Sequence, residues 1–218
     1  MSAGALTFLF DVKSPHAYLA LQPTLEMLDE LSQEVDWQPL LVAPQERAQK
    51  PPVDGDRGAH HRWHRAAYRV RDLRRYALAR GFAEDCFSDA RLFDCGAARE
   101  AAAGILWCQI HEPRQIRQVV SGLFERFWRD SLDLNSASDV DTAMNEIVGA
   151  EIGFKNHVAE AMTMLDTQQA QLREAGCFDV PGYLLADEVY YGRQHLPVVK
   201  WLLQGGSGHS PAWGRYQE

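Results

Sequence analysis

The feature that most constrains the fold is a short apolar strand that runs directly into a helix start. Residues 6–12 read Leu-Thr-Phe-Leu-Phe-Asp-Val, and so continuous an apolar run is typical of a strand buried on both faces. Ser14-Pro15 follows. Serine is a favoured helix N-cap, and proline is favoured at the first helical position. We expect this helix to reach Leu31, with a kink at Pro23, and a second strand over residues 35–42. The first 42 residues therefore predict a right-handed βαβ unit with parallel strands.

The rest of the chain predicts a helical block followed by a hairpin. Helical periodicity appears over residues 59–80, 97–111, 114–129, 138–149 and 154–175. Strand character returns at 183–185 and 189–191, and a last helix is expected over 193–203. We therefore predict an α/β fold in which residues 1–42 and 176–204 form one discontinuous domain with a single sheet. Residues 43–175 would be a helical insertion, and residues 205–218 a mobile tail.

Composition and charge narrow the possible partners. The 218 residues include 46% hydrophobic and 24% charged residues, which fits a folded chain. No apolar run approaches the roughly 20 residues of a membrane span, and the N-terminus lacks the pattern of a secretory signal. We expect a cytoplasmic protein with no membrane partner. A net charge of −8 argues against nucleic-acid binding. Eight arginines lie between Arg57 and Arg80. They form either a solvated helix face or a basic surface that attracts anions.

The cysteines exclude two kinds of site. They stand at positions 86, 95, 108 and 177, with no Cys-x-x-Cys pair, so neither a zinc ribbon nor a dithiol redox centre is expected. We predict reduced, partly buried thiols, with a Cys86–Cys95 disulfide as the alternative. His60 and His64 are one helical turn apart, but no third ligand is evident, and no metal site is predicted.

Two short segments are candidates for a binding site. A helix N-terminus that follows a buried strand attracts anions, because free N–H groups and the helix dipole converge there. Ser14 occupies that position, although it could serve as an N-cap alone. Val180-Pro181 precedes the hairpin, and the general statistics of X-Pro bonds favour a trans peptide there.

Several motifs together resemble a known family. These are Phe-Asp-x-x-Ser-Pro-x-x-Tyr over residues 10–18, Gly-x-Phe-x-Val-Pro over 176–181, Tyr190-Tyr191-Gly192, and Arg65-x-x-Tyr68-x-x-x-Asp72-Leu73. They resemble the thioredoxin-like superfamily and, more narrowly, the 2-hydroxychromene-2-carboxylate isomerases and kappa-class glutathione transferases. These families are relatives of the bacterial disulfide oxidoreductases. The resemblance covers residues 6 to about 203. It implies a thioredoxin-like sheet with a helical insertion, a cis Val180-Pro181 bond and a homodimer.

The resemblance also implies a chemistry. Where the redox relatives carry Cys-x-x-Cys, this chain reads Ser14-Pro15-His16-Ala17. Dithiol exchange is therefore excluded there, because it needs an attacking thiolate. The resemblance implies glutathione as the cofactor, with the catalytic Ser14 hydroxyl stabilising its thiolate. In the isomerases the thiolate adds to a conjugated double bond, which rotates before the thiol is eliminated. In the transferases the addition is not reversed. The implied substrate is a small electrophilic, unsaturated or aromatic acid.

Further site residues follow from the same resemblance. The resemblance implies that the backbone of Val180, beside Pro181, pairs with glutathione. It also implies that the stretch that begins at Gly192 holds the γ-glutamyl end. The family's Lys…Asn loop after the second strand corresponds to a shortened segment at residues 47–52, where Arg47 and Gln49 are the nearest counterparts. Gly182 follows Pro181 where the family usually has threonine or a similar residue. The implied cofactor contacts are Arg47, Gln49, Val180, Pro181, Gly192, Arg193 and Gln194. The candidate substrate contacts are His16 and Tyr18, and His16 could act as a base, contact a substrate carboxylate or be merely solvated.

Two other functions remain open at the level of sequence. The chain could be a non-catalytic binding protein on the same fold, since residues 192–195 depart from the family pattern. It could also be a single-cysteine redox protein using Cys177, which lies close to Val180-Pro181 in the sequence. Against that role, the sequence offers no partner cysteine for Cys177, and the alternative is a packed, inert thiol.

Overall fold

Both ends of the chain contribute to one four-stranded sheet. The computed structural model describes residues 6–211 apart from 46, 48, 84 and 131. The strand order is β2 (Val35–Pro39), β1 (Leu6–Phe10), β3 (Gly182–Leu185) and β4 (Glu188–Tyr191). β1 is parallel to β2 and antiparallel to β3, and β4 is antiparallel to β3. The predicted α/β sheet built from both chain ends is confirmed.

Helices from the two chain ends pack together beside this sheet. α1 (Pro15–Leu31) begins at the Ser14 N-cap and continues through Pro23, and α8 (Leu196–Leu203) contacts α1. β1 ends at Phe10, two residues before the predicted boundary, and a turn at residues 12–13 leads into α1. A short 3-10 turn over Arg193–His195 precedes α8, so this helix begins three residues later than predicted. The start of α1 and the end of β4 thus come from opposite ends of the sequence.

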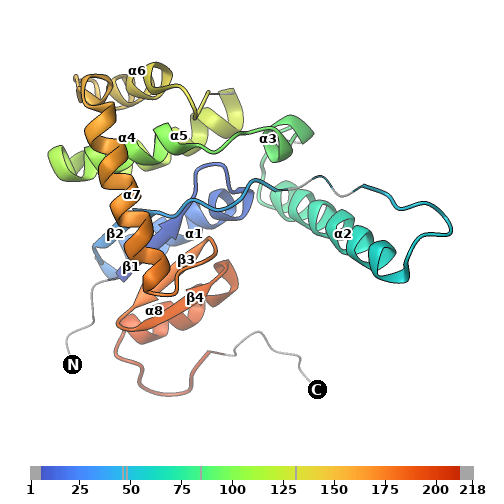
Figure 1. Ribbon diagram of the computed structural model, residues 1–218. Coiled ribbons are helices and arrows are strands. Elements are labelled where there is room, and N and C mark those ends of the chain that lie inside the picture. The colour runs from blue at the N-terminus through green and yellow to red at the C-terminus, as the bar shows by residue number, and fades with distance from the viewer. Residues whose placement is uncertain (1–5, 46, 48, 84, 131, 212–218) are drawn as a thin grey trace.

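The helical insertion lies between β2 and β3 in the sequence. It contains α2 (Arg57–Ala79), α3 (Asp89–Phe93), α4 (Arg99–His111), α5 (Ile116–Asp130), α6 (Ala137–Val148) and α7 (Val158–Glu174). Figure 1 shows α4, α5 and α6 gathered on one side of the sheet, with α7 running back from them past β2. The sequence did not predict α3, because five residues are too few to show a helical period.

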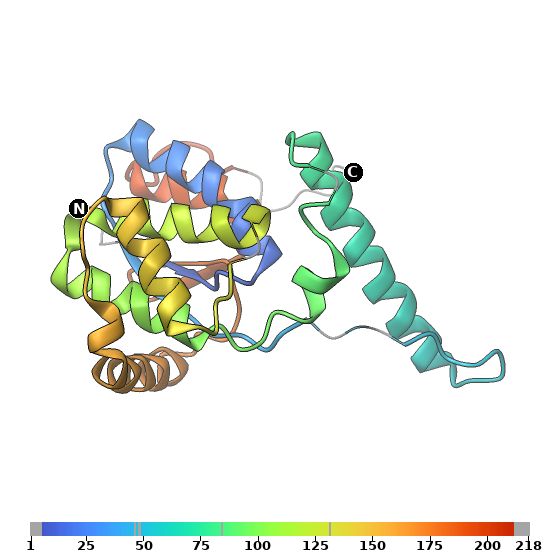
Figure 2. The same cartoon turned by 90° about the horizontal axis from the view of Figure 1, so that it is seen from above.

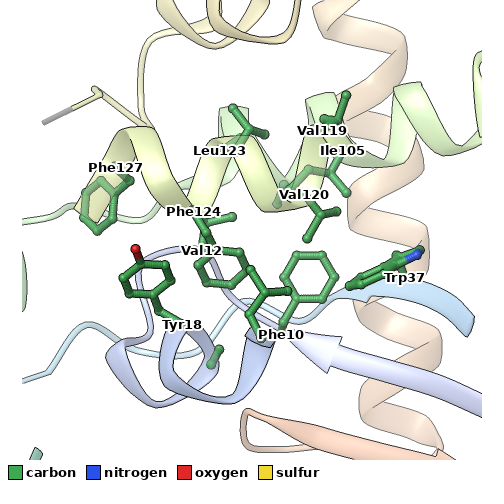
Figure 3. Packing of buried hydrophobic residues seen from close by; sticks show 14 of the residues in the cluster. Phe10, Val12, Tyr18, Trp37, Ile105, Val119, Val120, Leu123, Phe124 and Phe127 are labelled. Carbon is green, nitrogen blue, oxygen red and sulfur yellow. The ribbon is translucent and has the colours of Figure 1, made fainter. Parts of the chain in front are cut away.

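The main core lies between this helical group and the sheet. Figure 3 shows α5 directing Val120 and Phe124 toward Phe10 and Trp37 of the sheet. The Phe10 and Phe124 ring centroids are 5.8 Å apart, and both side chains are fully buried. The indole Nε1 of Trp128 donates a 2.9 Å hydrogen bond to the Val12 carbonyl just after β1. Packing and hydrogen bonding therefore fix α5 to the end of the strand that leads into α1.

Helix α2 differs from the other long helices. Figures 1 and 2 show it projecting from the body of the molecule. Only Leu73 and Ala77, near its C-terminal end, are buried. We call residues 50–80 the α2 arm.

The described residues test some smaller expectations. All four cysteines are free thiols, so the alternative Cys86–Cys95 disulfide is not formed. No helix in the described part of the chain is long and apolar enough to cross a membrane. The mobility of the tail stays a prediction: residues 212–218 lie outside the described residues, and the indole of Trp201 donates to the Ser207 carbonyl at 2.9 Å.

Candidate functional site

A cavity of about 550 Å³ opens where the start of α1 meets the end of the hairpin. This volume falls within the range of about 300–1,000 Å³ that is usual for small-molecule sites. Its wall comes from the turn before α1, the segment after β2, helix α2, and the residues on either side of β3 and β4. The lining residues are Lys13, Ser14, Pro15, His16, Val42, Ala43, Pro44, Gln45, Arg69, Cys95, Asp179, Val180, Pro181, Tyr191, Gly192, Arg193 and Gln194.

Ser14 lines this cavity at the N-terminus of α1. Its Oγ accepts a 3.3 Å hydrogen bond from the Ala17 N–H, and its own N–H donates to the Asp11 carbonyl at 2.8 Å. A hydroxyl has one proton to donate and two lone pairs to accept with. Capping uses only a lone pair, so the hydroxyl proton can be donated to an anion bound in the cavity. The N-cap role and the anion-binding role of Ser14 are therefore compatible.

Val180 and Pro181 line the same cavity as Ser14. Their peptide bond is cis, as the family resemblance implies, and the trans isomer favoured by X-Pro statistics is wrong here. The Val180 N–H donates a 2.8 Å hydrogen bond to Oδ1 of Asp179. The amide expected to pair with a ligand backbone is thus held by a neighbouring carboxylate, which a ligand would have to replace.

The segment 192–194 completes the hairpin side of the cavity. Gly192 has a φ of 90°, a conformation that favours glycine, and its N–H donates to the Pro181 carbonyl at 2.7 Å. The Arg193 guanidinium lies 3.7 Å from the centre of the Tyr76 ring on α2, within the range of a cation–π contact. Arg193 is therefore held between the hairpin and the α2 arm.

His16, in the first turn of α1, lies among charges of both signs. Partial removal from solvent lowers the pKa of its imidazole, and the positive charges of Arg193 and Arg69 act in the same direction. Asp179 and Asp72 oppose this effect. A lowered pKa leaves the ring neutral at neutral pH, so His16 can accept a proton beside Ser14.

Several cavity residues were not identified from the sequence. Lys13, Arg69, Asp179 and Cys95 all line the cavity, and with Arg193 they give its described lining three cationic side chains and one carboxylate. The one available signal was Asp11, a charged residue at the end of an otherwise apolar strand. A carboxylate buried there needs a partner, and Lys13 supplies it.

Three predicted site residues do not line the cavity. Arg47 is exposed, pairs with Asp89 at 2.8 Å and lies over the ring of Phe93, and Gln49 is also exposed. Tyr18 is 5% exposed and packs against α5 (Figure 3), where its ring stacks on Trp128. Successive helix positions point in different directions, so Tyr18 faces the core although His16 faces the cavity.

The surroundings of Cys177 and His60 do not indicate a redox or a metal site. Cys177 is 2% exposed and packs with apolar neighbours, and burial raises the pKa of its thiol. Its microenvironment is that of an inert cysteine. The His60 ring lies 2.9 Å from the Pro52 carbonyl. Among the described residues, no three His, Cys, Asp or Glu side chains gather in a metal-binding arrangement.

Comparison with known proteins agrees with this geometry. The model of the DSBA-like thioredoxin domain matches residues 5–204. The chain therefore belongs to the DSBA-like thioredoxin domain family, which confirms the thioredoxin-like fold with its helical insertion. No curated protein sequence matches the chain.

Solved structures with the same fold differ in activity. One is a 2-hydroxychromene-2-carboxylate isomerase, with 18% identity, a TM-score of 0.63 and 93% of each chain covered. Another is the cytosolic disulfide reductase DsbM from Pseudomonas aeruginosa, with 15% identity, a TM-score of 0.63, and 93% of this chain and 98% of that one covered. DsbM with glutathione matches at 19% identity and a TM-score of 0.54, with 93% and 94% covered. At these identities the likeness concerns the fold alone.

Proposed function

We propose that this protein is a glutathione-dependent isomerase or transferase that acts on a small electrophilic acid, unsaturated or aromatic. The observation that carries the proposal is that the Ser14 hydroxyl and the Val180-Pro181 peptide line one cavity. The family membership and the glutathione bound to DsbM, a protein of the same fold, support it. The absence of cysteine at positions 14 and 17 removes the dithiol alternative.

The cavity suits an anionic, peptide-like ligand. Lys13, Arg69 and Arg193 supply positive charge, and a helix N-terminus adds a favourable dipole. The Val180 backbone offers groups for pairing with a peptide once Asp179 has been displaced. Glutathione, when bound, supplies a nucleophilic thiol. The Ser14 hydroxyl would donate a hydrogen bond to its sulfur, favour the ionised form and orient it toward the substrate. His16 would accept or return a proton beside it.

Calorimetry and turnover test this proposal together. We expect glutathione to bind the wild-type protein, and turnover to be detected with either an α,β-unsaturated aromatic acid or an aryl halide activated by nitro groups. Ser14→Ala should lower turnover by about 100-fold, a loss typical of removing one stabilising donor. Ser14→Thr, which keeps a hydroxyl and a capping oxygen, is the matched control. Full activity of Ser14→Ala would show that the assigned role is wrong.

A non-catalytic binding protein is the second candidate. The hydrogen bond from Val180 N–H to Asp179 favours it, because that bond occupies a group needed for glutathione. Binding of glutathione without turnover of either substrate class would support this candidate. Absence of binding at millimolar glutathione would remove the first.

We also propose that two copies associate through the α2 arm. Residues 50–80 contain nine Lys or Arg and three Asp or Glu, a net charge of +6, which leaves −14 on the rest of the chain. The arm also exposes apolar surface, since Tyr68 is 52% and Val53 100% exposed. A basic arm and an acidic body are complementary between two copies.

Sedimentation velocity tests this association. The wild-type protein should be a dimer that weakens as salt is raised. The double variant Arg62→Glu/Arg65→Glu should be a monomer, while Arg173→Glu, an exposed substitution on α7, should remain a dimer. A wild-type monomer, or equal effects of both variants, would contradict the proposal.

A further inference from the structure

A second cavity of about 550 Å³ is formed by residues of α4, α7 and strand β2, and we call it the α4–α7 groove. Helix α4 packs against both α7 and β2, so the walls of the groove belong to fixed elements of the fold. No residue that lines the groove also lines the cavity at Ser14. The groove is therefore a separate candidate site.

Apolar side chains give the groove room for a hydrophobic ligand. Leu106 and Ile110 lie one helical turn apart on α4, and Met164 lies on α7. Leu106 is 6% exposed, whereas Ile110 is 61% exposed. Covering a large apolar side chain that is left in water is favourable, and an exposed apolar surface beside a cavity is typical of a binding site. The exposed Ile110 favours a ligand with an aliphatic or aromatic part.

The amides of the groove have a free acceptor, because their nitrogens bind other parts of the protein. The amide nitrogens of Gln109 and Gln38 both donate to the Asp36 carboxylate. The amide nitrogen of Gln168 donates to Oε1 of Gln38 at 2.8 Å. In contrast, the Oε1 atom of Gln109 is buried and has no hydrogen-bond partner among the described residues. A bound N–H donor would satisfy this acceptor.

The α7 wall of the groove also offers acceptors. The hydroxyls of Thr163 and Thr167 donate to carbonyls within α7 at 3.0 and 2.9 Å, and this leaves their oxygen lone pairs available. Glu160 adds a carboxylate that is 63% exposed. Gln171 is exposed, and its amide can donate or accept. The groove therefore suits a ligand that brings hydrogen-bond donors.

The charge of the groove is negative. No lysine or arginine is among its described lining residues. Glu160 lies 3.5 Å from the His157 ring, and Asp36 accepts its hydrogen bonds from neutral amides. Neither carboxylate forms an ion pair with a described lysine or arginine. An apolar groove with unbalanced negative charge favours a cation, in contrast to the cationic cavity at Ser14.

We propose that the α4–α7 groove binds a small hydrophobic ammonium ion, a primary amine on an aromatic or aliphatic body. An ammonium group has three donors and no acceptor, which complements the Glu160 carboxylate and the unpaired Gln109 oxygen. The apolar body would cover Ile110 and Met164. The site does not depend on glutathione or on any reaction at Ser14.

Titration with three probes of similar shape tests the ligand class. The probes are 2-phenylethylamine, which is cationic at neutral pH, the neutral 2-phenylethanol and the anionic 3-phenylpropionate. We expect the amine to bind the wild-type protein with a dissociation constant of about 1 mM or below, as a ligand of this size allows. Methyl NMR signals of Met164 and Ile110 should shift on binding, while that of the buried Met27 on α1 should not. The alcohol should bind at least about tenfold more weakly, because it lacks the charged hydrogen bonds.

Matched variants test the position of the site. Glu160→Gln should weaken binding of the amine by about fivefold, a modest loss because the carboxylate is exposed. Glu174→Gln makes the same change at an exposed position on α7 outside the groove and should bind like the wild type. Equal binding of the alcohol or the acid at Met164 and Ile110 would overturn the ligand class. Unmoved Met164 and Ile110 signals, or equal losses in the two variants, would overturn the site.

Discussion

Helices α5 and α2 belong to the same insertion but are built for different tasks. Seven of the fifteen residues of α5 are buried, whereas only two of the twenty-three residues of α2 are. α5 carries an apolar stripe that packs on the sheet, and α2 carries seven arginines and reaches the cavity through Arg69. The difference indicates that α5 stabilises the fold, while α2 contributes charge to the site.

The largest expected effect is a loss of stability from a substitution in the buried face of α5. Phe124→Ala removes a fully buried ring that packs against Phe10 and Tyr18, so the free energy of unfolding should fall by about 3–5 kcal/mol. Urea unfolding measures it. Tyr68→Ala on the exposed face of α2 is the control and should change stability by less than about 0.5 kcal/mol. Equal losses would mean that α2 is as firmly packed as α5.

A substitution of Arg193 tests how much the charge beside α2 contributes to ligand binding. Arg193→Leu removes a cation from the cavity and its contact with Tyr76, so glutathione affinity should fall about tenfold, as expected for one charged hydrogen bond. The melting temperature should barely change. Arg71→Leu removes the same charge from an exposed position on α2 outside the cavity. An equal loss with Arg71→Leu would show that total charge matters and the position of Arg193 does not.

Asp179 should have a smaller effect of the opposite sign. Asp179→Ala frees the Val180 N–H and removes a carboxylate that lines the cavity, so an anionic peptide ligand should bind about fivefold more tightly. Isothermal titration calorimetry measures the change. Asp187→Ala, in the exposed hairpin turn, is the control. Weaker binding of Asp179→Ala would show that this carboxylate contacts the ligand favourably.

The smallest expected effect is a pH dependence from His16. Its pKa in the folded protein lies below the ordinary value of 6.5. The unfolded chain therefore takes up the proton first as pH falls, and stability is lost from pH 6.5 down to the folded pKa. The loss should be small, because the side chain is exposed and its interactions are screened by solvent, and it should appear as a falling melting temperature. His16→Asn should flatten that part of the profile, and an unchanged slope would exclude His16 as its source.

The sequence predicted those parts of the site that depend on local chemistry. Ser14 was identifiable because N-capping and Pro15 act within one helical turn, and Val180-Pro181 because proline stands immediately before a strand. The sheet followed from apolar strands at both ends of the chain. Each of these signals depends on a few neighbouring residues, so it can be recognised without knowledge of the tertiary contacts.

The parts that depend on distant segments could not be predicted. Arg69 reaches the cavity only because the C-terminal end of α2 packs near α1, and Cys95 only because the segment before α4 returns to β1. Arg47 was assigned to the site from its place in a loop, but Asp89, forty-two positions away, binds it elsewhere. Side chains of this kind find partners by tertiary approach, which leaves no periodic signal in the sequence.

The stacking of Arg193 on Tyr76 has a consequence for how the molecule would work as a whole. One guanidinium faces the cavity and at the same time rests on the α2 arm. Any molecule that moved the arm would also move a cation of the site, and filling the site would be felt along the arm. Thermodynamic linkage requires the two effects to be equal in size, so occupancy of one location would tune affinity at the other by a common factor.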